Sequence, residues 1–267
     1  MFLFAKKTWL VAVAAGALTL SACSPKEDQA ATTEPNAGAE AVVYKVAVDA
    51  AYAPFEYQDD KGQVIGFSKD VLQAVADKAG IKVDFIPNPW EGIFATLEQG
   101  DRDIVLASVT ITPERQQTMT FSEPYFEATQ MIAVSDKAGD VTGLNDLKDK
   151  TVSVQNGTTG DLVMQKLQGK TSTMIKRFES MPLALKELLA GGVVASVGDN
   201  GVMQNFINNN PNANLKVIVD ADFEKEHYGF VVKKGRQDLA DKINEGLKGI
   251  REDGTYDQIY AQWFSAK

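Results

Sequence analysis

The sequence lacks a second cysteine: Cys23 is the only one among 267 residues. A single cysteine cannot form an internal disulfide, so the fold must depend on its hydrophobic core. About 245 residues follow the N-terminal segment that has the pattern of an export signal. This length suffices for one large domain or two modest ones.

A basic surplus and long apolar runs are also missing. Acidic residues outnumber basic ones by 36 to 27, and removal of Lys6 and Lys7 with the signal would leave 36 against 25, a net charge of about −11. Such a surface repels nucleic acid and anionic lipid headgroups, so we expect no nucleic-acid partner. No apolar run after residue 22 approaches the length of a membrane span, so we do not expect the sensor module of a transmembrane receptor.

Histidine is equally scarce, since His227 is the only one. The sequence has no cluster at metal-ligand spacing and no Ser-His-Asp order, so we expect no metal, no cofactor and no catalytic triad. His227 itself falls at an apparent return crossover between two structural halves. We therefore expect it to be a hinge or surface residue.

The first 22 residues have the pattern of an export signal. Lys6 and Lys7 precede an apolar core, residues 9–20, that is too short to serve as an anchor helix. The segment ends in Leu20-Ser21-Ala22 directly before Cys23. Small residues before a cysteine resemble the bacterial lipobox, in which the thiol receives a diacylglyceryl group and becomes the new N-terminus. We expect residues 1–22 to be a lipoprotein signal and Cys23 to carry the only membrane anchor; the alternative is a chance cysteine beside an ordinary cleavage site.

Residues 23–41 consist of small and polar residues, with no aromatic and no large aliphatic side chain. Such a segment cannot bury enough apolar area to fold, and it is typical of a flexible tether. We expect the folded part to begin near Val42.

From residue 42 onwards, strand-like runs alternate with helical ones, which predicts an α/β fold. A first set has strands at 42–48, 83–86 and 103–107, with helices after 66 and through Ile93 and Leu97. The near-continuous apolar strands suit a parallel sheet that is covered on both faces.

A second set begins at residues 131–134. Its further segments are strands at 151–154, 193–197 and 215–219 and a helix at 182–190. The chain then returns through 230–232 to a helix with one apolar stripe, formed by Leu239, Ile243, Leu247 and Ile250. Because no linker separates the sets, we expect two packed lobes, with residues 42–132 and 227–267 in lobe 1 and 133–226 in lobe 2.

Residues 103–115 carry the strongest chemical signal. A buried strand runs out into Ser108 and Thr110 and then meets Pro-Glu-Arg at a helix start. In open α/β sheets, ligands bind beyond the carboxyl ends of strands, where hydroxyl and backbone N–H groups suit an anion. Arg115 adds a planar, two-pronged donor that matches a carboxylate. The residues alone leave open the alternative of a capped helix with a surface arginine.

The order of motifs resembles the amino-acid-binding solute-binding proteins of ABC importers, the group of the histidine-, lysine/arginine/ornithine- and glutamine-binding proteins. The resemblance extends from Val43 to Phe264. It implies a type II periplasmic-binding-protein fold, in which each lobe is a mainly parallel sheet flanked by helices and two strands form the hinge. The matching motifs are VDAAYAPFE (48–56), IGF (65–67), NPW (88–90), SVTITPER (108–115), FSEPY (121–125), VQNGTT (154–159), GD (198–199) and REDGTY (251–256).

This resemblance implies how a free L-amino acid would be bound. A zwitterion needs a fixed cation and a fixed anion, and these would be Arg115 for the α-carboxylate and Asp199 for the α-ammonium. Without the resemblance, Asp199 would be read as a turn residue. Ser108 and Thr110 would add hydroxyl and backbone contacts.

Further contacts are implied from the second lobe and from two aromatic residues. Thr158 and Thr159, in a glycine-containing loop before a helix, would supply N–H donors to the same carboxylate. Tyr52 and Trp90 would bracket the ligand side chain, unless they are ordinary core aromatics. Asp49 would reach that side chain and favour a polar or cationic group.

Two departures from the relatives stand out. Residues 191–195 read GGVVA where relatives usually have Gly-Arg-x-Asp-Ala, which we expect to affect folding or partner contacts more than the pocket. Gly160 replaces a larger polar residue of some relatives, and we expect it to open space in the pocket. Arginine, lysine, histidine, glutamine and cystine all stay open as ligands.

The function expected from this sequence is binding without chemistry. The chain would be a monomeric, lipid-anchored protein of the periplasm or cell surface that delivers an amino acid to an ABC transporter permease. The alternative is an enzyme of the cyclohexadienyl dehydratase type on the same fold, which would need a positioned acid or base.

Overall fold

The structure, a computed structural model, describes residues 42–135 and 138–265. The described residues fall within one compact unit. The signal at residues 1–22, the lipid site at Cys23 and the tether to residue 41 lie outside the described residues. No helix in these ranges is both long and apolar enough to span a membrane.

The first sheet has the strand order β5-β1-β6-β14-β7. Strand β1, between β5 and β6, is fully buried at Val46, Ala47 and Val48, because helices cover both faces of the sheet. The pairings of β1 with β5 and β6 are parallel, whereas β14 runs antiparallel to β6 and β7. The strands are β1 (Val43–Val48), β5 (Lys82–Pro87), β6 (Ile104–Leu106), β7 (Met119–Phe121) and β14 (Val231–Lys233).

Helices and a small three-stranded sheet complete what we call lobe 1. The apolar stripe of α7 packs on α1, and Gly246 permits this close approach because a Cβ there would collide with the Val75 backbone. The remaining elements are β2 (Ala51–Tyr52), β3 (Glu56–Gln58), β4 (Val64–Ile65), α1 (Phe67–Ala79), α2 (Ala95–Gln99), α3 (Pro113–Thr118), α7 (Gln237–Glu252) and α8 (Thr255–Phe264).

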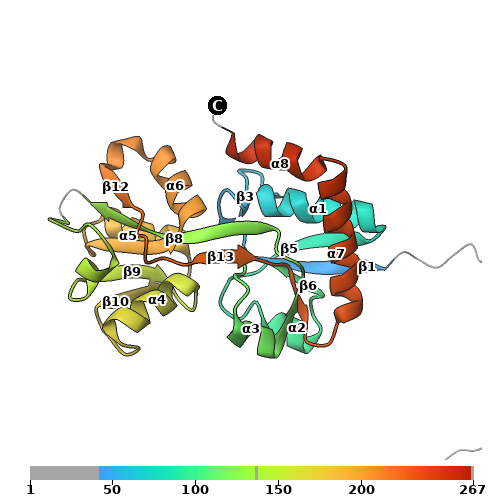
Figure 1. The fold of residues 1–267 in the computed structure, drawn as a ribbon, viewed down its shortest axis with the longest axis horizontal. Coiled ribbons are helices and arrows are strands. Elements are labelled where there is room, and N and C mark those ends of the chain that lie inside the picture. Colours follow the sequence, from blue (N-terminus) through green and yellow to red (C-terminus); the bar gives the residue numbers. More distant parts are fainter. Residues whose placement is uncertain (1–41, 136–137, 266–267) are drawn as a thin grey trace, which may run out of the picture. The chain divides into compact units, whose positions relative to one another are not determined.

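The second sheet has the order β10-β9-β11-β8-β12 and, with its helices, forms what we call lobe 2 (Figure 1). The pairings among β10, β9 and β11 are parallel, and β8 runs antiparallel to β11 and β12. The elements are β8 (Phe126–Ser135), η1 (Leu144–Leu147), β9 (Val152–Gln155), α4 (Thr159–Gln168), β10 (Ile175–Phe178), α5 (Met181–Leu189), β11 (Ala195–Asp199), α6 (Asn200–Asn209), η2 (Pro211–Ala213) and β12 (Leu215–Ile218).

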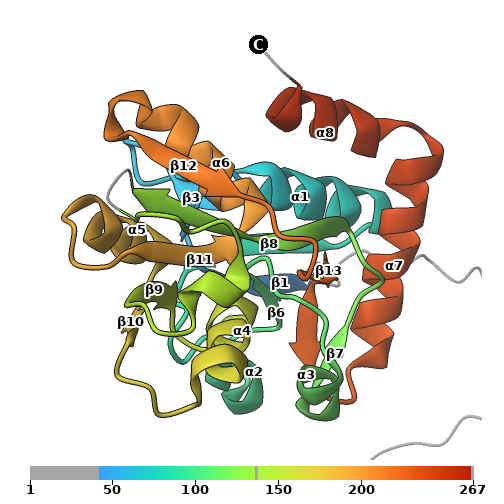
Figure 2. The ribbon, with the colours of Figure 1, turned by 60° about the vertical axis from the view of Figure 1, so that its left-hand side comes forward.

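Two strands connect the lobes. Strand β8 pairs with β13 (Lys225–Tyr228) at its start and then continues into the lobe 2 sheet beside β11 (Figure 2). Tyr228 also bridges to Thr110 of lobe 1. His227 lies exposed on β13, which confirms its expected place at the hinge and surface.

The expected α/β fold with two lobes and a two-strand hinge is confirmed. In the sheet of each lobe one strand, β14 or β8, runs antiparallel to its neighbours, and the other strands of the order given above point the same way. The strand expected at 193–197 is β11, shifted by two residues, which makes Asp199 its last residue. The lobe boundaries expected at 132/133 and 226/227 fall inside β8 and β13 and stay a prediction.

Candidate functional site

One cavity brings together all nine residues that the sequence singled out for ligand contact. The space between atoms there amounts to about 270 Å³. The lining consists of those nine residues with Ala107 and Gln155: Asp49, Tyr52, Trp90, Ala107, Ser108, Thr110, Arg115, Gln155, Thr158, Thr159 and Asp199.

The lobe 1 wall follows the strand-to-helix pattern read from the sequence. Strand β6 ends at Leu106, and the chain passes through Ser108 to α3, whose first turn is capped by Thr112. Ser108 has φ 45°, a left-handed conformation that costs of order 1–3 kcal/mol for a residue with a Cβ. Its Oγ donates to the buried Glu56 Oε2 at 3.1 Å. This bond holds the residue at the point where the wall turns into the cavity.

Arg115 lies at the junction of the two lobes. Its Nη1 donates to the Thr110 carbonyl at 2.9 Å, and its Nη2 donates to the Gly157 carbonyl of lobe 2 at 3.3 Å. The guanidinium carbon lies 5.6 Å from the centre of the Trp90 ring. Burial lowers the pKa of Arg115, and Asp199 and Glu226 counteract this, so the group keeps its charge. The cavity therefore contains a fixed cation.

Asp199 provides the fixed anion from lobe 2. Its Oδ2 accepts from Tyr52 of lobe 1 at 2.7 Å and also from Tyr228, and its Oδ1 accepts from Gln130 at 2.6 Å. Burial and the nearby carboxylate raise the pKa of Tyr52 and Tyr228 well above the usual value, so both hydroxyls stay donors. Three donors thus hold a carboxylate that is only 5% exposed.

A second carboxylate lies in the lining without a cationic partner. Asp49 follows the end of β1 and accepts from Gln155 Nε2 at 3.2 Å. Among the described residues, no lysine or arginine forms an ion pair with it. Burial raises the pKa of Asp49 to about 6, against the opposing effect of the Gln155 hydrogen bond.

The lobe 2 wall is a turn that leads from β9 into α4. Thr158 is the N-cap: its Oγ1 accepts from the Asp161 N–H at 3.4 Å and donates to the Gln155 carbonyl at 2.8 Å. The first N–H groups of α4, starting at Thr159, have no carbonyl within the helix to bond, and the helix dipole adds positive potential there. The start of α4 therefore suits a carboxylate, whereas the Thr158 N–H bonds to the Gln155 carbonyl at 3.4 Å; the ligand contacts expected of Thr158 and Thr159 stay a prediction.

The expectation for Gly160 is wrong. A Cβ at this position would lie 2.9 Å from Gln130 Oε1 and 3.1 Å from the Val197 carbonyl. The space that the missing side chain leaves is thus already filled by Gln130 and β11. Gly160 permits α4 to pack on β11 and does not enlarge the cavity.

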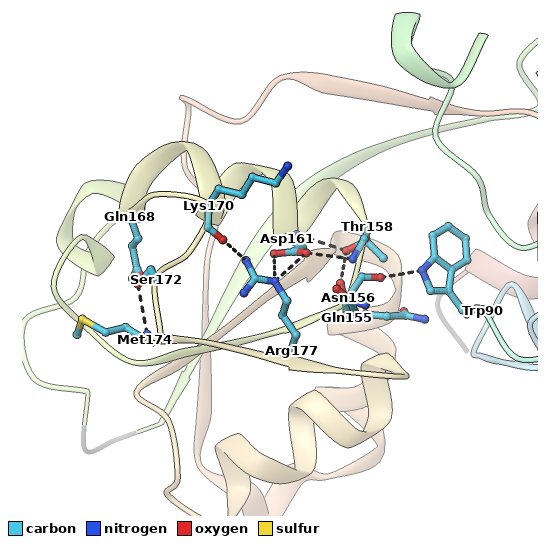
Figure 3. Close-up of polar contacts among 11 residues, drawn as sticks. Trp90, Gln155, Asn156, Thr158, Asp161, Gln168, Lys170, Ser172, Met174 and Arg177 are labelled. Carbon is cyan, nitrogen blue, oxygen red and sulfur yellow. Dashed lines mark hydrogen bonds and ion pairs between the residues drawn. The ribbon is translucent and has the colours of Figure 1, made fainter. Parts of the chain in front are cut away.

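Trp90 closes the cavity towards one side. Its ring is 9% exposed and packs edge-on against Phe94, and its Nε1 donates to the Asn156 carbonyl of lobe 2 at 2.8 Å (Figure 3). Like Tyr52 and Arg115, it contacts the opposite lobe directly. A ligand would enter between groups that already bond across the cleft.

Four residues near the site were not found from the sequence: Gln130, Gln155, Glu226 and Tyr228. Glu226, on β13, accepts at Oε2 from Thr110 at 2.7 Å and from Thr159 at 2.8 Å, and at Oε1 from Gln130 at 3.0 Å. Burial and Asp199 raise the pKa of Glu226. The hydroxyls of Thr110 and Thr159, one from each lobe, therefore meet on a hinge carboxylate. The only sequence signal for Glu226 is its place just before His227 in the return segment.

Comparison with known proteins agrees with this geometry. Residues 44–266 match the family of bacterial extracellular solute-binding proteins, family 3. The chain belongs to this family. It is 42% identical over 261 residues to a probable histidine-binding protein of Neisseria gonorrhoeae, covering 97% of this chain and 96% of that one.

Solved structures of family relatives have the same fold. The arginine-, lysine-, histidine-binding protein ArtJ of Geobacillus stearothermophilus is 42% identical, with a TM-score of 0.80 over 85% of this chain and 96% of that one. An ancestral amino-acid-binding protein, described as a precursor of cyclohexadienyl dehydratase, is 36% identical, with a TM-score of 0.74 over 84% of this chain and 95% of that one.

Proposed function

We propose that this family 3 protein binds a free L-amino acid with a cationic side chain between its lobes and delivers it to an ABC importer. The observation that carries the proposal is that Arg115 and Asp199, of opposite charge and from different lobes, line one small cavity. A zwitterion offers complementary charges to both groups at once. The relatives from Neisseria and Geobacillus are named for basic amino acids, of which arginine and lysine are cations at neutral pH, and this supports the proposal.

The charges of the cavity support a cationic side chain. A bound zwitterion would pair its carboxylate with Arg115 and its ammonium with Asp199. Asp49 then remains as the one charged residue of the described lining without a partner of opposite charge. A buried carboxylate without a cation is costly, and its raised pKa reflects that cost. A guanidinium, ammonium or imidazolium group on the ligand would supply the missing cation.

Ligand binding would exchange contacts between the lobes for contacts through the ligand. Arg115 now donates to Gly157 and Tyr52 to Asp199, so both charged groups are occupied across the cleft. The ligand would take over these bonds and add those of its own side chain. A higher affinity for the closed arrangement is what shifts the lobes towards closure.

The transport role extends the proposal to the N-terminal segment. Residues 1–22 would be removed as a lipoprotein signal, and Cys23 would carry the lipid that anchors a monomeric protein in the periplasm or at the cell surface. Residues 23–41 would act as the tether. Cys23→Ala should release the protein into the soluble fraction of cells; retention on membranes would contradict the anchor.

The proposal is binding without chemistry. The relatives named above are binding proteins, and His227, the only histidine, lies exposed on the hinge and outside the cavity lining. The alternative, an enzyme of the cyclohexadienyl dehydratase type, would consume its ligand.

A calorimetric titration followed by chromatography of the ligand tests the proposal. We expect one molecule bound per chain and the amino acid recovered unchanged. Conversion to a new product would support the enzyme, and absence of binding to any amino acid would overturn the proposed function.

A further inference from the structure

The turn formed by residues 156–158, between β9 and α4, is one of the parts of lobe 2 that meet lobe 1 around the cavity. Its Asn156 carbonyl accepts from Trp90 Nε1 at 2.8 Å, and its Gly157 carbonyl accepts from Arg115 Nη2 at 3.3 Å. Both donors belong to lobe 1. The position of the 156–158 turn therefore affects the cation that is expected to hold the ligand carboxylate.

A buried carboxylate in α4 holds this turn from behind. Asp161 is 1% exposed, and its Oδ2 accepts from the Gly157 N–H at 3.0 Å (Figure 3). The Asp161 N–H in turn bonds to Thr158 Oγ1 at 3.4 Å. One side chain and its own backbone thus fix both Gly157 and Thr158.

Arg177, on the neighbouring strand β10, neutralises this carboxylate. Its Nε lies 2.9 and 3.1 Å from the two oxygens of Asp161, and its Nη2 donates to the Lys170 carbonyl at 3.3 Å. The Arg177 side chain is partly exposed whereas that of Asp161 is buried. Removing the arginine would leave a buried charge unpaired, which the turn would have to relieve by moving.

We propose that Asp161 and Arg177 are positioning residues that set the affinity for the α-carboxylate of the ligand, although neither lines the cavity. They act through the 156–158 turn, by aligning the N–H groups at the start of α4 that follow it and by placing the Gly157 carbonyl against Arg115. This inference rests on the proposed function and deepens it. It assigns the pair to the α-carboxylate of the ligand only, since Asp49 and Tyr52, from lobe 1, would contact the ligand side chain.

A purely structural role for the pair makes a different prediction. If the pair only stabilised lobe 2, its loss would weaken all ligands to the same extent. If it positions the carboxylate-binding turn, the loss should depend on whether the ligand has an α-carboxylate. L-arginine and L-argininamide differ only in that group and are the probes.

The experiment measures the Kd of both probes by calorimetry for the wild type and for Arg177→Gln, Asp161→Asn and Arg177→Lys. We expect Arg177→Gln and Asp161→Asn to raise the Kd of L-arginine by at least about tenfold and the Kd of L-argininamide by less than about threefold. Arg177→Lys keeps the charge and should restore L-arginine to within about threefold of the wild type. If Asp161→Asn does not fold, the two variants of the partly exposed Arg177 decide.

A matched control comes from the adjacent residue of β10. Lys176 forms an ion pair with Glu187 at 2.7 Å in the same lobe but does not contact the 156–158 turn. Lys176→Gln should leave both Kd values within about twofold of the wild type.

Two results would overturn the inference: equal losses for both probes, or an undiminished affinity for L-arginine in Arg177→Gln and Asp161→Asn. A wild type that binds no cationic amino acid would instead contradict the proposed function, so the two failures can be told apart.

Discussion

The two lobes contribute different kinds of residues to the lining of the cavity. Lobe 1 contributes long side chains at the ends of strands and at helix starts: Asp49, Tyr52, Trp90 and Arg115. Lobe 2 contributes the smaller polar residues Gln155, Thr158 and Thr159, where β9 leads into α4, with Asp199 as its one charged group in the lining. A lobe 1 side chain can be tested directly by mutation, whereas the placement of Thr158 and Thr159 also depends on Asp161, which holds the preceding turn.

This difference suggests a division of tasks. The ammonium and carboxylate of an amino acid are common to all candidate ligands, and they meet groups from both lobes. In the proposed binding mode, the ligand side chain would meet Asp49, Tyr52 and Trp90, all from lobe 1. Lobe 1 would therefore determine which amino acid binds, and lobe 2 would contribute to how tightly any amino acid is held.

Removing the cation of lobe 1 should have the largest effect. Arg115→Ala eliminates the proposed bidentate pair with the α-carboxylate of the ligand, in which each charge-assisted hydrogen bond contributes about 1.5–3 kcal/mol. We therefore expect calorimetry to show a loss of at least about 100-fold in affinity for the amino acid. The melting temperature of the free protein should change little, because the Arg115 side chain hydrogen-bonds only two backbone carbonyls and otherwise packs on the Trp90 ring. Undiminished affinity would remove Arg115 from the site.

Removing the anion of lobe 2 tests whether the two walls grip opposite ends of one ligand. Asp199→Asn keeps an acceptor for Tyr52 but loses the charge, and we expect about 30-fold weaker binding. A double-mutant cycle with Arg115→Ala should give nearly additive losses, because the two groups contact separate parts of the ligand. If Asp199→Asn binds as tightly as the wild type, the ammonium is held elsewhere.

The division of tasks can be sharpened at Asp49. Asp49→Asn should weaken L-arginine by about tenfold and L-glutamine by less than about twofold, since only the cationic side chain needs the charge. Competition experiments at pH 8 measure both. Equal losses for the two ligands would show that Asp49 does not select the side chain.

The same residue predicts a pH dependence. The pKa of Asp49 in the free protein is about 6, so the affinity of the wild type for L-arginine should fall as the pH is lowered through 6. The folded-state pKa lies above the ordinary value of 3.8, so the stability that Asp49 contributes is present below that value and lost as the pH rises through about 6. Asp49→Asn should therefore raise the melting temperature of the free protein at pH 8, by at least about 2 °C. An unchanged or lower melting temperature would mean that the carboxylate carries no burial cost.

The smallest effect is expected at Trp90. Trp90→Phe keeps an aromatic face for the ligand but removes the N–H that bonds the Asn156 carbonyl of the opposite lobe. We expect about threefold weaker binding, expressed in a faster dissociation rate measured by stopped-flow fluorescence. A slower association with unchanged dissociation would show that Trp90 guides entry and does not hold the lobes together.

The sequence predicts the position of a candidate site residue best where the residues of the site follow one another in a single segment. Ser108, Thr110 and Arg115 follow a buried strand and precede a helix, and that pattern placed them at the end of β6 before any contact was known. Asp199 was assigned through resemblance alone, since its surroundings read as a turn; the structure instead makes it the last residue of β11.

The residues that the sequence did not give are those whose role depends on distant pairing. Gln130 and Glu226 come together because β8 pairs with β13, a register that no local pattern encodes. Gly160 was misread for the same reason, because the space beside it is decided by Gln130 and Val197. Val193 and Val194 were expected to begin the strand, but β11 begins at Ala195. Apolar residues indicate which positions are buried and do not show where the hydrogen bonds between strands begin.

A calorimetric panel on the wild-type protein tests the central claim most directly, because it separates charge from shape. L-arginine and L-citrulline have nearly the same shape, and only arginine carries a side-chain charge; L-lysine, L-histidine and L-glutamine complete the set. We predict that the tightest ligand is cationic and that L-arginine binds at least about tenfold tighter than L-citrulline. A neutral amino acid as the tightest ligand, or equal affinities for arginine and citrulline, would contradict the account.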